Sequence, residues 1–77
     1  MQIVTNETSQ AIIKATEILG GKQNLAKDIG VSYKTILDWI SGRSGITVTN
    51  ALKVEKATGG KVKSRDILPD FPWDDLK

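Results

Sequence analysis

The stretch that decides the fold of this 77-residue chain is KQNLAKDIGVSYKTILDWIS, at positions 22–41. Its first part carries apolar side chains at helical spacing, namely Leu25, Ala26 and Ile29. This spacing predicts a short helix over residues 22–29. Gly30 comes next and can adopt a positive φ without steric strain, so we expect it to end the helix and open a tight turn.

A second helix is predicted directly after this turn. Ser32 is a favoured N-cap residue, and the pattern that follows indicates a helix from Tyr33 to about Ile40. Its expected inner side consists of Ile36, Trp39 and Ile40. Its expected outer side consists of Tyr33, Lys34, Leu37 and Asp38. Two short helices that cross closely need a small residue at the crossing, which Ala26 supplies, so the stretch predicts a helix-turn-helix.

The flanking sequence predicts further short helices. A first helix is expected to begin after an N-cap at Asn6 or Thr8 and to end at the glycine pair 20–21. Its apolar positions are Ile12, Ala15, Ile18 and Leu19. Residues 43–46 are expected to form a polar loop. Thr47 follows this loop and can cap a fourth helix, which the glycine pair 59–60 ends. The apolar side of this fourth helix is expected to be Val48, Ala51, Leu52 and Val54.

The C-terminal part predicts one capped turn and then a non-helical tail. We expect Ser64 to cap a single turn over residues 65–68 that stops near Pro69. Phe71 and Trp73 are large apolar rings in a short acidic segment, where exposure is unfavourable. We expect Phe71 to fold back on the core, whereas Trp73 could fold back or form part of a dimer contact.

These elements together predict an all-α fold, a small bundle of four to five short helices. At this length we expect one domain over residues 1–77, with a helical core at 7–68 and an acidic tail at 69–77.

The composition narrows the classes of function. The chain contains no Cys and no His, which excludes disulfides, Cys/His zinc sites and Cys or His nucleophile–base pairs. Because no paired carboxylates stand at a defensible site either, we expect neither an enzyme nor a cofactor. The apolar run at 11–13 is interrupted by Lys14 and is too short for a signal peptide or a membrane span. We therefore expect a soluble cytoplasmic protein.

Charge is distributed unevenly along the chain. Residues 1–65 contain ten Lys and Arg against five Asp and Glu, whereas residues 66–77 contain four Asp against one Lys. A basic body with an acidic tail favours a polyanion as the partner of the body. An ordinary solvated surface is the alternative interpretation of charge alone.

The stretch at 22–41 resembles the helix-turn-helix of phage Cro and CI-type repressors, in which a small Ala, a turn Gly and inward Val or Ile recur at this spacing. Beyond it the chain reads WISGR at 39–43, VEKATGG at 54–60 and DILPD at 66–70. These motifs are similar to those of the Cro-like YdaS antitoxin family, over most of residues 7–71. Members of that family often have Pro where this chain has Thr47, which can cap the fourth helix equally well. The resemblance implies the lambda-repressor-like DNA-binding fold.

The resemblance also implies a function, namely a phage or prophage Cro-like repressor that binds an operator in double-stranded DNA. We expect a homodimer on a palindromic site, because one recognition helix has a small footprint and palindromic sites mirror two-fold protein symmetry. The base-reading residues that the resemblance implies are Ser32, Tyr33, Lys34, Leu37 and Asp38. Lys34 could donate to guanine, and Asp38 could accept from the amino group of cytosine or pair with a neighbour such as Arg43. The phosphate-binding candidates are Lys22, Gln23, Thr35 and Arg43.

Alternatives stand beside these interpretations. Trp39 falls on the inward spacing with Ile36, so we expect it in the core rather than stacked on a base. The protein could also be an antitoxin-like module that binds a protein partner through its C-terminal tail, with DNA binding secondary. No membrane partner is expected.

Overall fold

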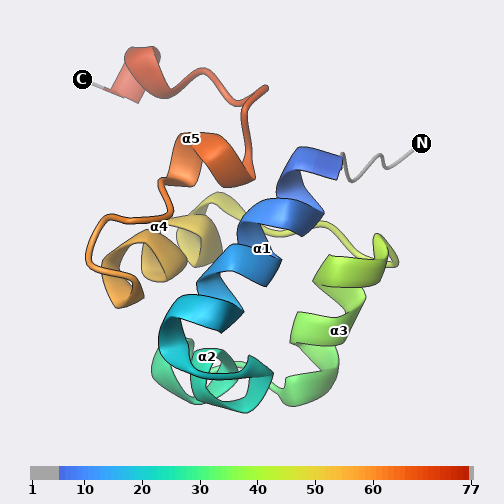
Figure 1. Cartoon of the computed structure of the whole chain (residues 1–77). Coiled ribbons are helices and arrows are strands. Elements are labelled where there is room, and N and C mark those ends of the chain that lie inside the picture. Colours follow the sequence, from blue (N-terminus) through green and yellow to red (C-terminus); the bar gives the residue numbers. More distant parts are fainter. Residues whose placement is uncertain (1–5, 77) are drawn as a thin grey trace.

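The computed structural model describes residues 6–76 of the chain, with side chains over residues 7–75. This part of the chain contains five α-helices and one 3₁₀ helix, and no strand; their arrangement is seen in Figure 1. The helices are α1 (Asn6–Leu19), α2 (Lys22–Ile29), α3 (Tyr33–Ser41), α4 (Val48–Ala57) and α5 (Ser64–Ile67), followed by the 3₁₀ helix η1 (Trp73–Leu76). The predicted all-α bundle of short helices is confirmed.

Helix α1 lies at the centre of the bundle. It contacts α2, α3 and α5, while α4 packs against α2 and α5 (Figure 1). Its apolar stripe contributes Ile12 and Ala15, both of which are fully buried. The rest of the core comes from every other helix and from two connecting segments, and its largest fully buried side chains are Ile12, Leu25, Ile36, Val54, Val62 and Ile67.

Local signals set the helix boundaries where the sequence predicts them. The predicted range 22–29 is that of α2, and α3 ends one residue beyond the predicted Ile40. Thr47 caps α4 as expected, because its hydroxyl accepts a hydrogen bond of 3.2 Å from the backbone N–H of Asn50. Each of these signals acts within four residues, so tertiary packing has little opportunity to override it.

Two expected N-caps are wrong. Thr8 is the third residue of α1 and is buried, and its hydroxyl donates to the carbonyl of Ile67 at 2.6 Å. Ser64 is the first helical residue of α5, whose N-cap is Lys63. The hydroxyl of Ser64 is used elsewhere, because it donates to the carboxylate of Glu55. Both hydroxyls therefore join helices together instead of closing the end of their own helix.

Two burial expectations for the segment around α4 are also wrong. Ile46, which we expected in a polar loop, is 7% exposed and belongs to the core. Leu52, expected on the apolar side, is 48% exposed. Helix α4 packs against α2 and α5 through a narrow stripe that includes Ala51 and Val54, and Leu52 lies outside it. The connection before α4 turns Ile46 inward, so that Ile46 adds an apolar side chain to the core.

The C-terminal tail is more ordered than its sequence pattern indicates. Residues Trp73–Leu76 form one turn of 3₁₀ helix, where we expected no helix. Trp73 packs against the core, and its indole N–H donates to the carbonyl of Leu68 at 2.8 Å. Phe71 is half-buried and tilts against Trp73, with ring centroids 4.7 Å apart. Trp73 is therefore the ring that anchors the tail, and Phe71 packs on it.

Candidate nucleic-acid interface

The turn between α2 and α3 has the predicted left-handed glycine. Gly30 has φ 76° and ψ 34°, and its N–H and that of Val31 both donate to the carbonyl of Ala26, at 2.9 and 3.0 Å. Ala26 is buried, as expected of a small residue at a helix crossing. Val31 packs against the core just beyond the turn. These backbone N–H groups of the turn thus have hydrogen-bond partners within the motif, and the turn fixes the direction in which α3 leaves it.

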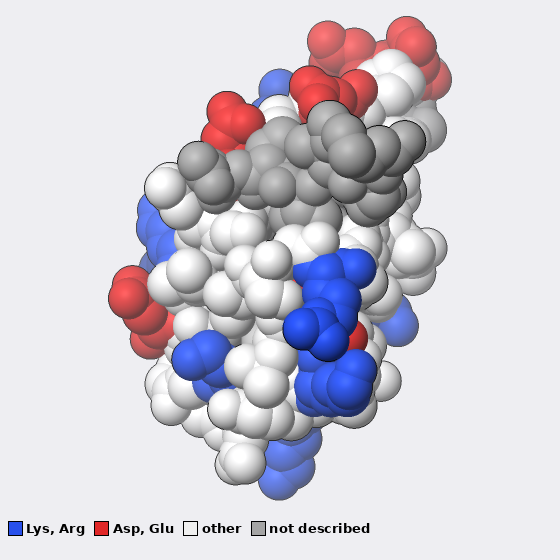
Figure 2. Space-filling model, turned by 90° about the vertical axis from the view of Figure 1, so that its right-hand side faces the viewer, with Lys and Arg blue, Asp and Glu red and all other residues white. Residues whose placement is uncertain are grey.

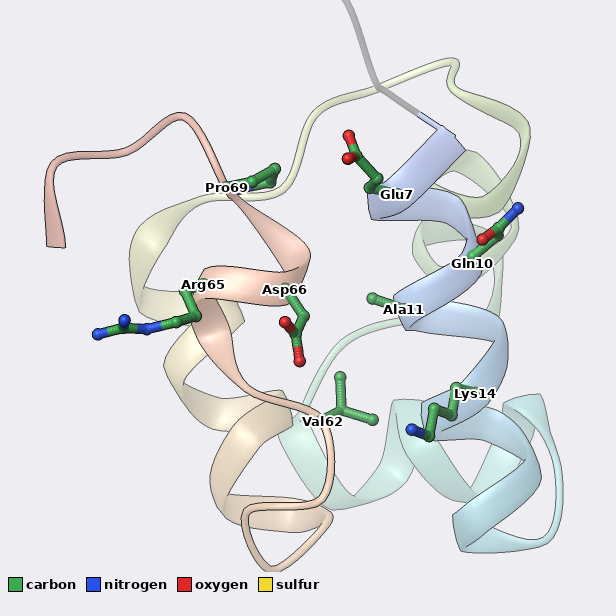
Figure 3. A pocket seen from close by; sticks show the side chains of 8 residues that line it. All are labelled: Glu7, Gln10, Ala11, Lys14, Val62, Arg65, Asp66 and Pro69. Atoms are coloured by element: carbon green, nitrogen blue, oxygen red, sulfur yellow. The ribbon is translucent and has the colours of Figure 1, made fainter.

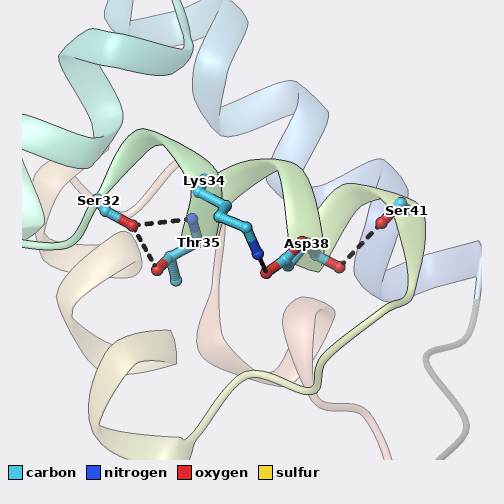
Figure 4. Close-up of polar contacts among 5 residues, drawn as sticks. All are labelled: Ser32, Lys34, Thr35, Asp38 and Ser41. Carbon is cyan, nitrogen blue, oxygen red and sulfur yellow. Dashed lines mark hydrogen bonds and ion pairs between the residues drawn. The ribbon is translucent and has the colours of Figure 1, made fainter.

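The amino end of α3 is closed by side chains that we expected at the interface. Ser32 accepts a hydrogen bond of 3.1 Å from the backbone N–H of Thr35, and the two hydroxyls hydrogen-bond each other at 2.8 Å (Figure 4). Ser32 is therefore an N-cap and Thr35 is its partner. Both remain at the surface of the first turn, although their hydroxyls already have partners.

The outer face of α3 is uncovered while its inner face is anchored. Ile36 and Trp39 are buried, which confirms Trp39 as a core residue. Tyr33 and Leu37 are 45% and 39% exposed, and Lys34 is also exposed. An exposed aromatic and an exposed aliphatic side chain on one helix face offer apolar contact area beside a cation. This combination suits a face that meets a partner.

Asp38 lies on the same outer face but is not free. Its carboxylate is 3.3 Å from the ammonium of Lys34, one helical turn earlier (Figure 4). The structure therefore pairs Asp38 with Lys34, and not with Arg43, the neighbour that the sequence suggests as an example of a partner. The backbone carbonyl of Asp38 accepts from the N–H groups of Gly42 and Arg43, which end α3.

The phosphate-binding candidates lie at both ends of α3. Lys22 and Gln23 begin α2 and border a shallow depression of about 280 Å³ together with Tyr33. The start of α2 has no side-chain cap, so its first N–H groups remain available to an anion. Arg43 is exposed and follows Gly42, the C-cap residue of α3. The fold thus brings Lys22, Gln23 and Tyr33 together and places Arg43 apart from them.

The charge of this face differs from that of the tail. Figure 2 looks onto the side of the molecule where α3 lies, and Lys and Arg gather over the centre and lower part of that side. Asp and Glu lie mainly toward the upper end, where the C-terminal segment is. Positive charge and exposed helix surface therefore coincide.

A groove of about 320 Å³ between α1 and α5 is a weaker candidate (Figure 3). Its charged lining is balanced, with Glu7 and Lys14 from α1 facing Arg65 and Asp66 from α5. A groove without excess positive charge offers little attraction to a phosphate backbone. In the part of the chain that the structure describes, no group of acidic, Cys or His side chains could hold a metal ion. No described helix is long and apolar enough to cross a membrane.

The motif VEKATGG at 54–60 turns out to organise the connection from α4 to α5. Glu55 accepts from both the backbone N–H of Ser64, at 2.7 Å, and the Ser64 hydroxyl. Thr58 accepts from the buried N–H of Val62 at 3.1 Å and donates to the carbonyl of Val54. Sequence reasoning missed this role, because these partners are separated by a loop that the pattern does not describe.

The hydrogen bonds from Ser64 also affect the titration of Glu55. The Ser64 hydroxyl, and next its backbone N–H, lower the pKa of Glu55 below its ordinary value. Partial burial opposes this shift, and the positive charges of Lys63 and Arg65 reinforce it. Glu55 is therefore an ionised tether for α5 and takes no part in the α3 face.

Comparison with known proteins gives relatives over nearly the whole chain. Residues 12–76 match the family described as Bacterial toxin YdaS. The chain is 33% identical over 57 residues to the regulatory protein cro of Pseudomonas phage D3. The aligned segment covers 74% of this chain and 78% of that protein. The chain is 30% identical over 64 residues to "Putative transcriptional regulator YdaS" of Escherichia coli strain K12, with 83% of this chain and 65% of that protein covered.

No solved structure matches the chain with comparable significance. The family description uses the word toxin, not antitoxin, whereas both relatives are named for a role in regulation. Neither relative is named as an enzyme. The chain belongs to the YdaS family and is related to phage Cro proteins.

Proposed function

We propose that this protein is a transcription regulator that binds operator DNA by placing α3 in the major groove. The observation that carries the proposal is the outer face of α3, where Tyr33, Lys34 and Leu37 are exposed while Ile36 and Trp39 hold the helix against the core. An α-helix with its side chains is about 10–12 Å in diameter, and the major groove is about 12 Å wide. The helix can therefore enter the groove and present this face to base edges.

Phosphate contacts would position α3 in the groove. Lys22 and Gln23 stand beside Tyr33 at one end of α3, and Arg43 stands at the other. Groups at both ends of a recognition helix can hold the two sugar–phosphate strands that border the groove. These contacts would supply most of the salt-dependent affinity and little of the sequence preference.

We further propose that the protein acts as a homodimer on a palindromic operator, as a Cro-like repressor in the cytoplasm. One short recognition helix covers few base pairs, and a two-fold dimer doubles the site that is read. The two copies of α3 would then be about 34–36 Å apart, one turn of DNA. Both relatives are named for a role in regulation, which supports the role in transcription.

The proposal is tested by selecting binding sites from a randomised duplex pool at physiological salt. Wild-type protein should enrich a palindromic motif. Leu37→Glu should weaken binding to that motif at least tenfold, because it places a carboxylate against the groove. Leu52→Glu is the matched control: it adds the same charge at a leucine that is 48% exposed on α4, and should change affinity about twofold or less. Equal effects of the two variants would refute α3 as the interface.

Protein binding through the acidic tail is the second candidate function. Asp70, Asp74 and Asp75 are exposed around the half-buried rings of Phe71 and Trp73. Replacing these three aspartates with Asn keeps the rings that hold the tail in place. Loss of a protein partner with specific DNA affinity retained would favour this second function.

A further inference from the structure

Lys34 and Asp38 form a linked donor and acceptor on the outer face of α3. Their side-chain nitrogen and oxygen atoms, Nζ and Oδ2, are 3.3 Å apart. This is the one ion pair within the described residues. The Lys34 side chain is 78% exposed and that of Asp38 only 22% exposed, so the carboxylate lies close to the helix and the ammonium reaches over it (Figure 4).

The stability of α3 does not account for this placement. Lys34 is the second residue of α3 and Asp38 lies in its last turn, while the first turn has no acidic residue and the last has no basic one. The helix macrodipole favours the opposite arrangement, and the order Lys before Asp is the weaker one for a pair four residues apart. Exposed pairs also contribute little to stability. Such conflicts with local preference tend to occur at functional surfaces.

We propose that Lys34 and Asp38 read one base pair together, and that this base pair is G·C with the guanine facing Lys34. The proposal rests on the proposed entry of α3 into the major groove. In a G·C pair, guanine O6 and cytosine N4 are hydrogen-bonded to each other, about 2.9 Å apart. This spacing is close to the 3.3 Å between Lys34 Nζ and Asp38 Oδ2. The donor and acceptor of the protein can thus face an acceptor and a donor of the base pair at once.

The other three base pairs fit this pair of side chains less well. A C·G pair turns guanine O6 and N7 toward the Asp38 carboxylate, which meets only acceptors. An A·T pair sets the adenine amino group against the Lys34 ammonium, donor against donor. A T·A pair has the right order, but Lys34 then meets one acceptor and a methyl group, while Asp38 lies next to the adenine N7 acceptor. Guanine instead offers Lys34 two acceptors, O6 and N7.

The test compares the sites that two variants select from the same randomised duplex pool as the wild type. Lys34→Met keeps an apolar stem of similar length and removes the donor. We expect it to lose the preference for G·C at one position of each half-site, by about tenfold in relative affinity. Asp38→Asn keeps the shape and exchanges the carboxylate for an amide. We expect the same position to change to T·A, because an amide pairs with adenine N6 and N7.

The outcomes separate this proposal from DNA binding as such. Altered preference at one shared position supports joint reading. Effects at two different positions, or an Asp38→Asn motif identical to that of the wild type, would overturn it while leaving DNA binding by α3 intact. If the wild type enriches no motif, both proposals fail.

A matched control distinguishes reading of bases from loss of positive charge. Lys22→Met removes the same charge from an exposed lysine at the start of α2. It should weaken binding to all sequences evenly and leave the selected motif unchanged. Thermal unfolding followed by circular dichroism checks that each variant keeps the wild-type fold.

Discussion

Glu55 joins two helices through a carboxylate whose partners belong to a single residue nine positions later. Its oxygen Oε1 accepts from the backbone N–H and the hydroxyl of Ser64, at the start of α5. The carboxylate thus satisfies one N–H group that the helix itself leaves without a partner. Because the hydrogen bonds favour the ionised form, this contact links the stability of the bundle to pH.

Glu55→Gln should reduce stability at neutral pH and remove part of its pH dependence. The pKa of Glu55 is lowered in the folded state, first by the Ser64 hydroxyl, so the ionised group stabilises the fold above the unfolded-state pKa of about 4.3. This contribution is lost as pH falls through the folded pKa. We expect a difference of about 1 kcal/mol at pH 7 that disappears once the pH is below the folded-state pKa of Glu55, as measured by urea unfolding over a pH series. A difference that stays constant over this range would contradict the assignment.

The helix-turn-helix is an element whose geometry depends on one backbone conformation. Gly30 holds φ 76°, a region that residues with a Cβ rarely occupy. A Cβ added there would meet no atom within 4 Å, so any effect of substitution comes from the backbone alone. The other half of the turn, Ser32, is fixed by its own capping hydrogen bond. The angle between α2 and α3 therefore follows from two neighbouring local signals.

Gly30→Ala should destabilise the protein by about 1–2 kcal/mol, because a left-handed conformation is unfavourable for alanine. In a chain of this size, each kcal/mol lowers Tm by about 4–8 °C, which thermal unfolding can resolve. Gly45→Ala is the control, since Gly45 is exposed and has no positive φ. It should leave Tm unchanged or raise it slightly. A Gly30→Ala variant as stable as the wild type would show that the turn tolerates another conformation.

Negative and positive side chains lie in different regions of the molecule. The four aspartates from residue 66 onward are exposed at the end that carries α5 and the tail, and Lys and Arg gather on the side of α3 (Figure 2). Trp73 fixes the tail to the bundle through its packing and its hydrogen bond to Leu68. The negative charge is therefore held in place, and under the proposed function we expect it to direct a polyanion away from the tail and toward α3.

Replacing the aspartates of the tail with neutral residues should weaken the electrostatic preference of DNA for the α3 side. The triple variant Asp70→Asn, Asp74→Asn, Asp75→Asn should bind non-specific duplex DNA several-fold more tightly at low salt, because three repulsive charges are removed. Its advantage should vanish at high salt, where these exposed charges are screened. Fluorescence anisotropy with a non-specific duplex measures both. If affinity is unchanged at low salt, the tail lies too far from bound DNA to influence it.

The amino-acid sequence alone determined the features that depend on near neighbours along the chain. It specified the ranges of α2 and α3, the left-handed Gly30 and the caps at Ser32 and Thr47. The burial of Trp39 also followed from helical period. These features rest on backbone preference, on hydrogen bonds that span three or four residues, and on the side of a helix that an apolar stripe occupies.

Only the tertiary structure decided which of several polar or apolar partners each remaining side chain meets. Thr8 and Ser64 both look like caps, yet their hydroxyls bind Ile67, 59 residues away, and Glu55. Likewise Trp73, and not Phe71, packs against the core. A hydroxyl can find a hydrogen-bond partner, and a ring a packing partner, in many places near it in the sequence. Helix packing decides between these partners, because it brings distant segments together. The same packing leaves Lys34 exposed and Asp38 partly exposed on the outer face of α3.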